Sequence, residues 1–353
     1  MEIGKLMNIA SRIALVLGLT SLALHGSAYA DYSERADVQA YVEELVREHG
    51  FEESALLELF SQAERKDRIL ESIARPAERT LEWHEYRQIF VKEPRISQGV
   101  AFWNANEEIL DAAEARYGVA PEYVVAIIGV ETRYGRITGS YRVLDALMTL
   151  AFDYPPRSSF FRKELTEYLL LAREEGEDPT TFTGSYAGAM GYGQFIPSSY
   201  RAYAVDFDQD GARDIWANEA DAIGSVANYF KRHGWRAGEP VAMQVNLSDQ
   251  GADALATKSL SLERTVGELT AAGVELGEAE LDPGTAANLY RMMQPDTADY
   301  WLGFRNFYVI TRYNRSRLYA LAVHELSQAV LAARQLAAGT QAARVVAEPE
   351  VAE

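Results

Sequence analysis

The sequence predicts a mainly α-helical protein with one small β-containing insertion. Apolar residues recur at three- and four-residue intervals among charged ones over 32–117, which is the period of an amphipathic helix. The same period returns in 143–172 and 221–235. Composition changes over 237–300, where short β-like runs are separated by Gly, Asp and Pro. The chain therefore divides into helical regions and one segment of a different kind.

The N-terminal segment 1–30 has the pattern of a secretory signal and is not expected to belong to the fold. Lys5 and Arg12 flank a short start, "IALVLGLTSLAL" (13–24) is apolar, and "AYA" ends in small residues. We expect cleavage after Ala30, because the apolar run is shorter than the roughly 20 residues that a membrane span needs. An uncleaved anchor in the inner membrane is the alternative.

Cysteine usage and charge narrow the class of protein. The 353 residues include no cysteine, which excludes disulfides, thiol nucleophiles, cysteine metal sites and a lipid-carrying thiol. The formal net charge of −18 leaves no basic face for a phosphate backbone, so nucleic acid is not an expected partner. Hydrophobic residues make up 48% of the chain, enough for a sizeable core. We expect a soluble, monomeric protein that is exported to the periplasm.

The helical elements follow in order. Residues 31–117 are expected to form an N-terminal helical lobe. Pro121 then occupies the first position of a helix over 121–134, which Gly135 stops. Two further helices lie within 143–172 and are broken at "DYPPR". A Gly-rich segment, an acidic loop and an amphipathic helix follow, at 183–200, 206–214 and 221–235.

The insertion 237–300 is expected to form a small β lobe. Its β-like runs are "PVAMQVNL", "TVGELTAAGVEL" and "NLYRMM". We expect "FYVITRYN" (307–314) to return to the main body as a strand, and 317–337 to form the last helix. The tail 338–353 is expected to be disordered.

Glu131 is the first candidate for chemistry. It ends a helix that is apolar on most of its circumference, so its carboxyl group is expected to be partly desolvated, which disfavours the charged form. A carboxylic acid that stays protonated near neutral pH can protonate the leaving oxygen of a glycosidic bond. A helix-end glutamate paired with Arg133 or Arg136 is the plainer interpretation, and this stretch alone favours it.

The Gly-rich segment is the second candidate. Four glycines lie within ten residues and alternate with Tyr186, Tyr192, Gln194 and Phe195, which suits a backbone folded tightly against a ligand. Aromatic faces beside amide and hydroxyl groups match a sugar ring, which has apolar faces and polar edges. No phosphate-binding motif is present. A purely structural turn explains the spacing equally well.

The acidic loop "DFDQDGARD" (206–214) is a candidate calcium site. Its aspartates and glycine match positions 1, 3, 5, 6 and 9 of a calcium-binding loop, and Ala212 can offer its carbonyl oxygen at position 7. Ala217 stands at position 12, so Glu219 or Asp221 would have to close the shell. Alternating aspartates repel one another without a cation. We therefore prefer a structural calcium site to an empty acidic turn.

Several long blocks together resemble the lytic murein transglycosylase B family. They are "IIGVETRYGRITGSYRVLDAL", "GSYAGAMGYGQFIPSSYRAYAVDFDQDG", "DAIGSVANYFKRHGW" and "NFYVITRYNRSRLYALAV", within about 83–334. The resemblance implies a lysozyme-like catalytic core over 118–236 with a calcium loop at 206–221. It also implies a small β lobe over 237–300 and a return strand and C-terminal helix of the core over 301–337. Some family members carry a lipid on a cysteine, whereas this chain resembles the soluble members.

The resemblance also implies the reaction. The family cleaves the β-1,4 bond between N-acetylmuramic acid and N-acetylglucosamine in peptidoglycan without water and leaves a 1,6-anhydro ring. Glu131 matches its single catalytic carboxylate, which acts first as acid and then as base, so the resemblance overturns the plainer interpretation of this residue. No cofactor is expected for the chemistry. Glycan strands are the expected partner, with cell-wall synthesis proteins as further candidates.

By the same resemblance, further residues are assigned to the groove and the metal. The substrate groove is implied to contain Ser185, Tyr192, Gln194, Tyr313, Asn314 and Tyr86. The calcium ligands are implied to be Asp206, Asp208, Asp210, Ala212 and Asp221. Two other functions stay open at this point, a hydrolytic muramidase that uses the same acid and a wall-binding scaffold protein without turnover. A calcium-signalling protein fits less well, because the loop lacks its position-12 glutamate.

Overall fold

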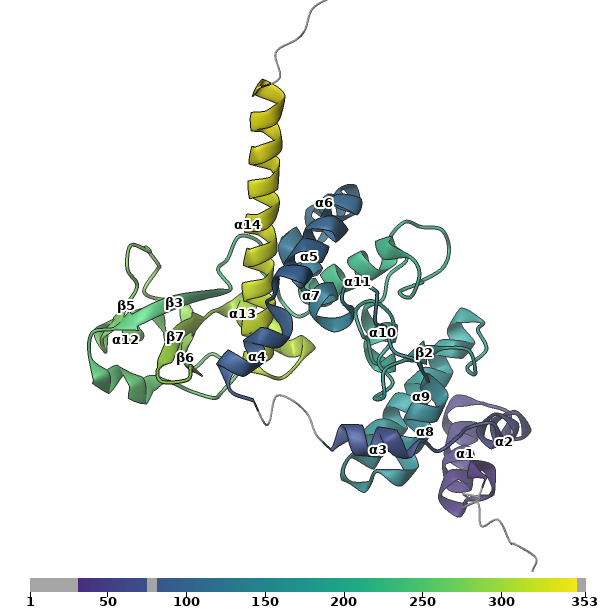
Figure 1. Ribbon diagram of the computed structural model, residues 1–353. Helices are drawn as coiled ribbons and strands as arrows, with labels where there is room; N and C mark the ends of the chain where they lie inside the picture. Colours follow the sequence, from purple (N-terminus) through teal and green to yellow (C-terminus); the bar gives the residue numbers. More distant parts are fainter. Residues whose placement is uncertain (1–30, 75–80, 348–353) are drawn as a thin grey trace, which may run out of the picture.

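The computed structural model describes residues 31–74 and 81–347, so the predicted signal segment 1–30 lies outside the described residues. The part that is described is mainly helical, with a small sheet at one end of an elongated molecule (Figure 1). None of its helices is both long enough and apolar enough to cross a lipid bilayer.

The expected N-terminal lobe, 31–117, is split between two parts of the molecule. The first helices are α1 (Ala36–His49), α2 (Glu53–Ser61) and α3 (Asp67–Ile73). They pack at one end with α8 (Val143–Asp153) and α9 (Ser158–Glu175). Tyr41, for example, reaches from α1 to Thr166 with an oxygen–oxygen distance of 2.8 Å. The prediction of a single lobe is therefore wrong, because helical periodicity does not reveal which distant helix covers an apolar face.

The remaining helices of that region belong to the central body. They are α4 (Trp83–Phe90), α5 (Glu93–Ala105) and α6 (Glu107–Tyr117). Together with α11 (Glu219–Arg232) and α14 (Arg317–Ala347), α5 and α6 surround α7 (Pro121–Thr132). Ten of the twelve residues of α7 are buried, so this helix is the centre of the core, as its composition predicts.

Short elements connect α7 to α11. A two-stranded antiparallel ribbon pairs β1 (Tyr141–Arg142) with β2 (Thr183–Gly184), and α10 (Pro197–Tyr203) follows the Gly-rich segment. The predicted break at 153–157 is confirmed, because α8 ends at Asp153 and α9 begins at Ser158.

The insertion forms an antiparallel sheet with strand order β4-β6-β7-β3-β5, which confirms the predicted β lobe. Its strands are β3 (Ala242–Leu247), β4 (Arg264–Thr265), β5 (Val274–Glu275), β6 (Ala286–Met293) and β7 (Ala298–Gly303). One prediction within it fails, because part of "TVGELTAAGVEL" is the helix α12 (Val266–Ala271). Thr265 and Glu268 make a capping box at the start of α12, and this pairing favours a helix over the β-like composition.

The return to the main body also differs from the prediction. Residues 305–313 form the helix α13 (Arg305–Tyr313), where a strand was expected. Its buried residues Asn306, Phe307, Val309 and Ile310 recur at helical spacing, and this period outweighs the β-branched composition. α14 runs to Ala347, past the predicted end at residue 337, so 338–347 are helical and not disordered. Residues 348–353 lie outside the described part of the chain.

Candidate active site and acidic loop

Glu131 lies in the last turn of α7, where the chain turns sharply away from the core. Arg133 and Tyr134 follow with φ angles of 52° and 61°, in the left-handed region that ends a helix. Gly135 also has a positive φ, and a Cβ atom there would lie 2.1 Å from the ring of Tyr192. This glycine therefore lets the Gly-rich segment approach the end of the helix that carries Glu131.

Tyr319 donates a hydrogen bond to Glu131. Its hydroxyl group, on the first turns of α14, lies 2.5 Å from Oε1 of Glu131, and 188 sequence positions separate the two residues. The Tyr319 side chain is buried, and this burial raises its pKa well above the ordinary value, with the charge of Glu131 raising it further. The phenol thus stays neutral and donates its proton. Tyr319 is not recognisable as a site residue from the sequence, because nothing local distinguishes it from a packing tyrosine.

The Gly-rich segment is held beside this pair by two hydroxyl groups. The Thr132 hydroxyl donates to the carbonyl oxygen of Tyr192 at 2.9 Å. Tyr313, at the end of α13, donates to the carbonyl oxygen of Gly193 at 2.6 Å. Burial raises the pKa of Tyr313 well above its usual value, and Glu131 adds to this effect. The structure therefore brings Tyr192 and Tyr313, both predicted from the sequence, to the segment beside Glu131.

Ser185 and Gln194 shape the same segment. Oγ of Ser185 accepts hydrogen bonds from the backbone N–H groups of Ala187 (3.3 Å) and Ala189 (3.1 Å). Nε2 of Gln194 donates to the carbonyl oxygens of Thr138 and Gly191, both at 3.0 Å. These bonds fix both side chains. Within the described residues, the Ser185 hydroxyl proton and the Gln194 Oε1 atom take part in none of them and stay available for other contacts.

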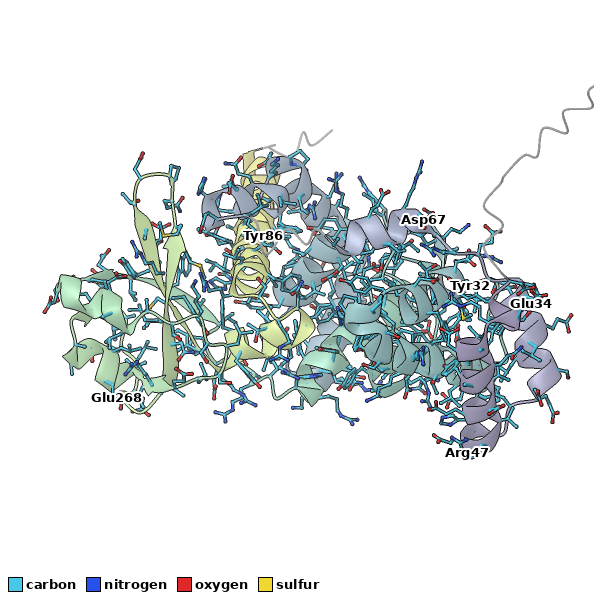
Figure 2. All side chains as sticks on the ribbon, turned by 90° about the horizontal axis from the view of Figure 1, so that it is seen from below. Tyr32, Glu34, Arg47, Asp67, Tyr86 and Glu268 are labelled. Atoms are coloured by element: carbon cyan, nitrogen blue, oxygen red, sulfur yellow. The ribbon has the colours of Figure 1, made fainter. Side chains whose placement is uncertain are left out.

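Tyr86 is the least exposed of the predicted groove residues. It is 1% exposed, and its ring centroid lies 5.2 Å from that of Phe90. Figure 2 shows Tyr86 on the helix that lies against α14, between the β lobe and the helical body. Its hydroxyl group adds to the electrostatic effects that raise the pKa of Tyr319. Tyr86 thus acts on the site through its electrostatic effect on Tyr319. Its contact with a substrate stays a prediction.

A cleft of about 830 Å³ opens between the Gly-rich segment, the α13–α14 turn, the β lobe and the N-terminal helices. Asn314 and Tyr186 line it, which places Asn314 where the sequence predicted a groove residue. Four of its side chains are cationic, namely Arg157, Lys258, Arg315 and Arg317. Glu82 is the one acidic residue in its lining, so in a chain with a net charge of −18 this cleft carries a local excess of positive charge.

The acidic loop has the arrangement of a cation site. Carboxylate oxygens of Asp206, Asp208 and Asp210 all lie within 4.8 Å of one another, as three ligands of one ion must. The two Asp206 oxygens also accept N–H groups of Asp210 (3.1 Å) and Gly211 (3.0 Å), which folds the loop around the cluster. The residues present therefore fit a calcium ion.

Asp221 lies outside this cluster of three. Both of its oxygens accept backbone hydrogen bonds, from Phe207 at 2.6 Å and Asp214 at 2.8 Å, so it braces the two ends of the loop. Its role as a direct ligand and that of the Ala212 carbonyl stay predictions.

The helical core, the acid at the end of its central helix and the cleft beside the Gly-rich segment define a lysozyme-like enzyme that acts on a glycan. The family model for the transglycosylase SLT domain matches residues 33–328. The chain is 44% identical over 313 residues to the membrane-bound lytic murein transglycosylase B of Escherichia coli K12, covering 86% of this chain and 85% of the relative.

Solved structures agree with this match. The soluble lytic transglycosylase SltB1 of Pseudomonas aeruginosa has a TM-score of 0.81 at 52% identity, over 85% of this chain and 99% of that one. The Escherichia coli lytic transglycosylase Slt35 in complex with calcium has a TM-score of 0.79 at 44% identity, over 86% of this chain and 95% of that one. The chain therefore belongs to the transglycosylase SLT domain family, and it is a lytic transglycosylase of the type of these relatives.

Proposed function

We propose that this protein cleaves the β-1,4 bond between N-acetylmuramic acid and N-acetylglucosamine in peptidoglycan and forms 1,6-anhydromuramyl ends. The hydrogen bond between Tyr319 and Glu131 carries this proposal, because it fixes one carboxyl group beside the Gly-rich segment at the end of a buried helix. One residue that gives a proton and then takes one back needs no second carboxylate.

The reaction requires two proton transfers through Glu131. In the first, its carboxyl group protonates the glycosidic oxygen as the C1–O bond breaks. In the second, the resulting carboxylate takes the proton of the C6 hydroxyl group while that oxygen bonds to C1. Tyr319 serves both steps, because its hydrogen bond orients the carboxyl group and stabilises the carboxylate that forms between them.

The cationic cleft suits the stem peptides of peptidoglycan, which carry carboxylates. Arg157, Arg315 and Arg317 come from different elements and line one opening, so they present several donors to an anionic chain. The groove residues Ser185, Tyr192, Gln194, Tyr313 and Asn314 are proposed to hold the sugar rings.

The metal and the location of the protein belong to the same proposal. Asp206, Asp208 and Asp210 are proposed to bind a structural calcium ion, as calcium is bound in the Slt35 complex. Calcium would supply no step of the chemistry and would hold the loop beside α11. Export to the periplasm through segment 1–30 is proposed on the sequence pattern alone.

The product distinguishes this function from hydrolysis. Mass spectrometry of fragments released from purified murein sacculi should show anhydromuramyl ends, which are lighter than reducing ends by one water. Hydrated ends would assign a hydrolytic muramidase with the same acid. Binding to sacculi without any release would instead assign a scaffold protein.

A further inference from the structure

A second cleft, of about 450 Å³, is lined by Thr183 at the start of the Gly-rich segment and shares no residue with the cationic cleft. Its walls are the end of α9 and the loop after it on one side, and the calcium loop on the other. The volume lies within the range of about 300–1,000 Å³ that small-molecule sites occupy. Of the residues assigned to the groove or the metal, only Ala212 lines this cleft, so those assignments give its other walls no role.

The cleft has an aromatic floor. The rings of Phe182 and Trp216 are stacked, with centroids 4.9 Å apart and an interplanar angle of 27°. Tyr200 adjoins Trp216 at 5.7 Å and is fully buried. Phe182 and Trp216 are only partly buried, so they give the cleft an apolar surface against which a sugar ring can stack.

Polar groups at the rim are placed for hydroxyl recognition. Within residues 31–74 and 81–347, neither the Thr183 hydroxyl nor the Glu177 carboxylate has a hydrogen-bond or salt-bridge partner, and both line the cleft. Arg213 lies over the ring of Tyr200 and is paired with Glu175. An aromatic floor beside free hydroxyl and carboxylate groups is the combination that binds the faces and edges of a sugar.

The cleft is joined to the catalytic groove through the backbone. Nε1 of Trp216 donates to the carbonyl oxygen of Thr183 at 3.0 Å, and Thr183 precedes the groove residue Ser185 by two positions. Tyr192 donates its N–H to the carbonyl oxygen of Ile215, next to Trp216, at 2.9 Å. Trp216 therefore lies beside the segment that leads directly to the groove residue Ser185.

We infer that the Phe182–Trp216 cleft is an outer subsite for an N-acetylhexosamine ring of the glycan strand, an inference that rests on the proposed function. The charge of the cleft determines which sugar ring it can bind. Glu175, Glu177 and Asp214 line the cleft and Arg213 is its single cation among the described residues, so stem-peptide carboxylates are repelled. The preferred ring is the uncharged N-acetylglucosamine without a stem peptide.

The test is calorimetric binding of N-acetylglucosamine oligomers of increasing length to the Glu131→Gln variant, with calcium present. We expect affinity to keep rising when the oligomer becomes longer than the groove. Trp216→Leu and Thr183→Val should lower the affinity for these longer oligomers about tenfold. Both changes should leave the affinity of the shortest oligomer that binds unchanged. Ser140→Ala is the matched control, since this exposed residue lies outside the cleft.

A second measurement follows the indole N–H resonance of Trp216 by NMR, assigned with Trp216→Phe. It should shift only with the longer oligomers. Length-dependent affinity that both variants keep, with a resonance that no oligomer moves, would overturn the subsite. Failure of every oligomer to bind would instead count against the proposed function, so the two failures are distinguishable.

Discussion

Glu131 and the aspartates of the loop 206–214 are carboxylates in opposite surroundings. Glu131 ends a helix with ten buried residues and accepts a hydrogen bond from a neutral phenol at 2.5 Å. Asp206, Asp208 and Asp210 lie near the surface, with oxygens within 4.8 Å of one another. A carboxyl group beside a neutral phenol at the end of a buried helix can gain and lose a proton, whereas clustered carboxylates need a cation. The comparison teaches that placement decides whether a carboxylate does chemistry or binds metal.

The largest effect is expected at Glu131. Glu131→Gln removes the only group that the proposed mechanism uses for proton transfer, so turnover of murein should fall by about 10³-fold. Glu122→Gln is the matched control, because Glu122 is a partly buried carboxylate at the other end of α7. Rates of anhydromuropeptide release measure both variants. Equal losses in the two would contradict the special position of Glu131.

Calcium should change stability, with little effect on turnover. Free calcium at 100-fold its Kd should add about 2.7 kcal/mol to the free energy of unfolding. Asp208→Asn should remove most of this gain, because it takes one carboxylate from the cluster of three. Thermal unfolding with calcium and with chelator measures it, and Asp111→Asn on the exposed side of α6 is the control. A melting temperature that chelator does not move would remove the calcium assignment.

Asp221 should affect stability without calcium. Asp221→Asn replaces one buried acceptor of a backbone N–H group by a donor, which should cost about 1–3 kcal/mol. Denaturant unfolding in chelator measures this loss, and Asp208→Asn should show no comparable loss under the same conditions. If the Asp221→Asn loss appears only with calcium, Asp221 is a metal ligand and not a brace.

The smallest effect is expected at Tyr319. Tyr319→Phe keeps the ring and removes the hydrogen bond that stabilises the carboxylate form of Glu131, so turnover should fall about tenfold. The mechanism starts from the protonated acid, so activity declines as pH rises. Without the phenol the carboxylate is less stable, and this decline should move to higher pH.

The pH–rate profile also identifies the role of Tyr319. Tyr117→Phe is the control, because this tyrosine of α6 is buried and is not part of the site. A lower rate with an unmoved profile would mean that Tyr319 serves packing alone.

Much of the helical architecture follows from local patterns. Pro121, the apolar run of α7 and the left-handed turn at Gly135 define the helix that carries Glu131, within two residues of its predicted end. The acidic loop is equally local, because its ligands come from alternate positions of one short segment. The assignment of Glu131 as catalytic came from resemblance to a family, since its own stretch favoured an ion pair.

By itself, the sequence determined most of the helices, though not α12 and α13, together with the β lobe, the aspartate cluster and the candidate acid, because each depends on neighbours along the chain. Only the tertiary structure decided that Tyr319 contacts Glu131, that Tyr313 holds Gly193, and that 31–117 divides between two parts of the molecule. These contacts join residues more than a hundred positions apart. Packing of apolar faces brings such residues together, and the local periodicity of the sequence does not indicate which helix faces will pack against each other.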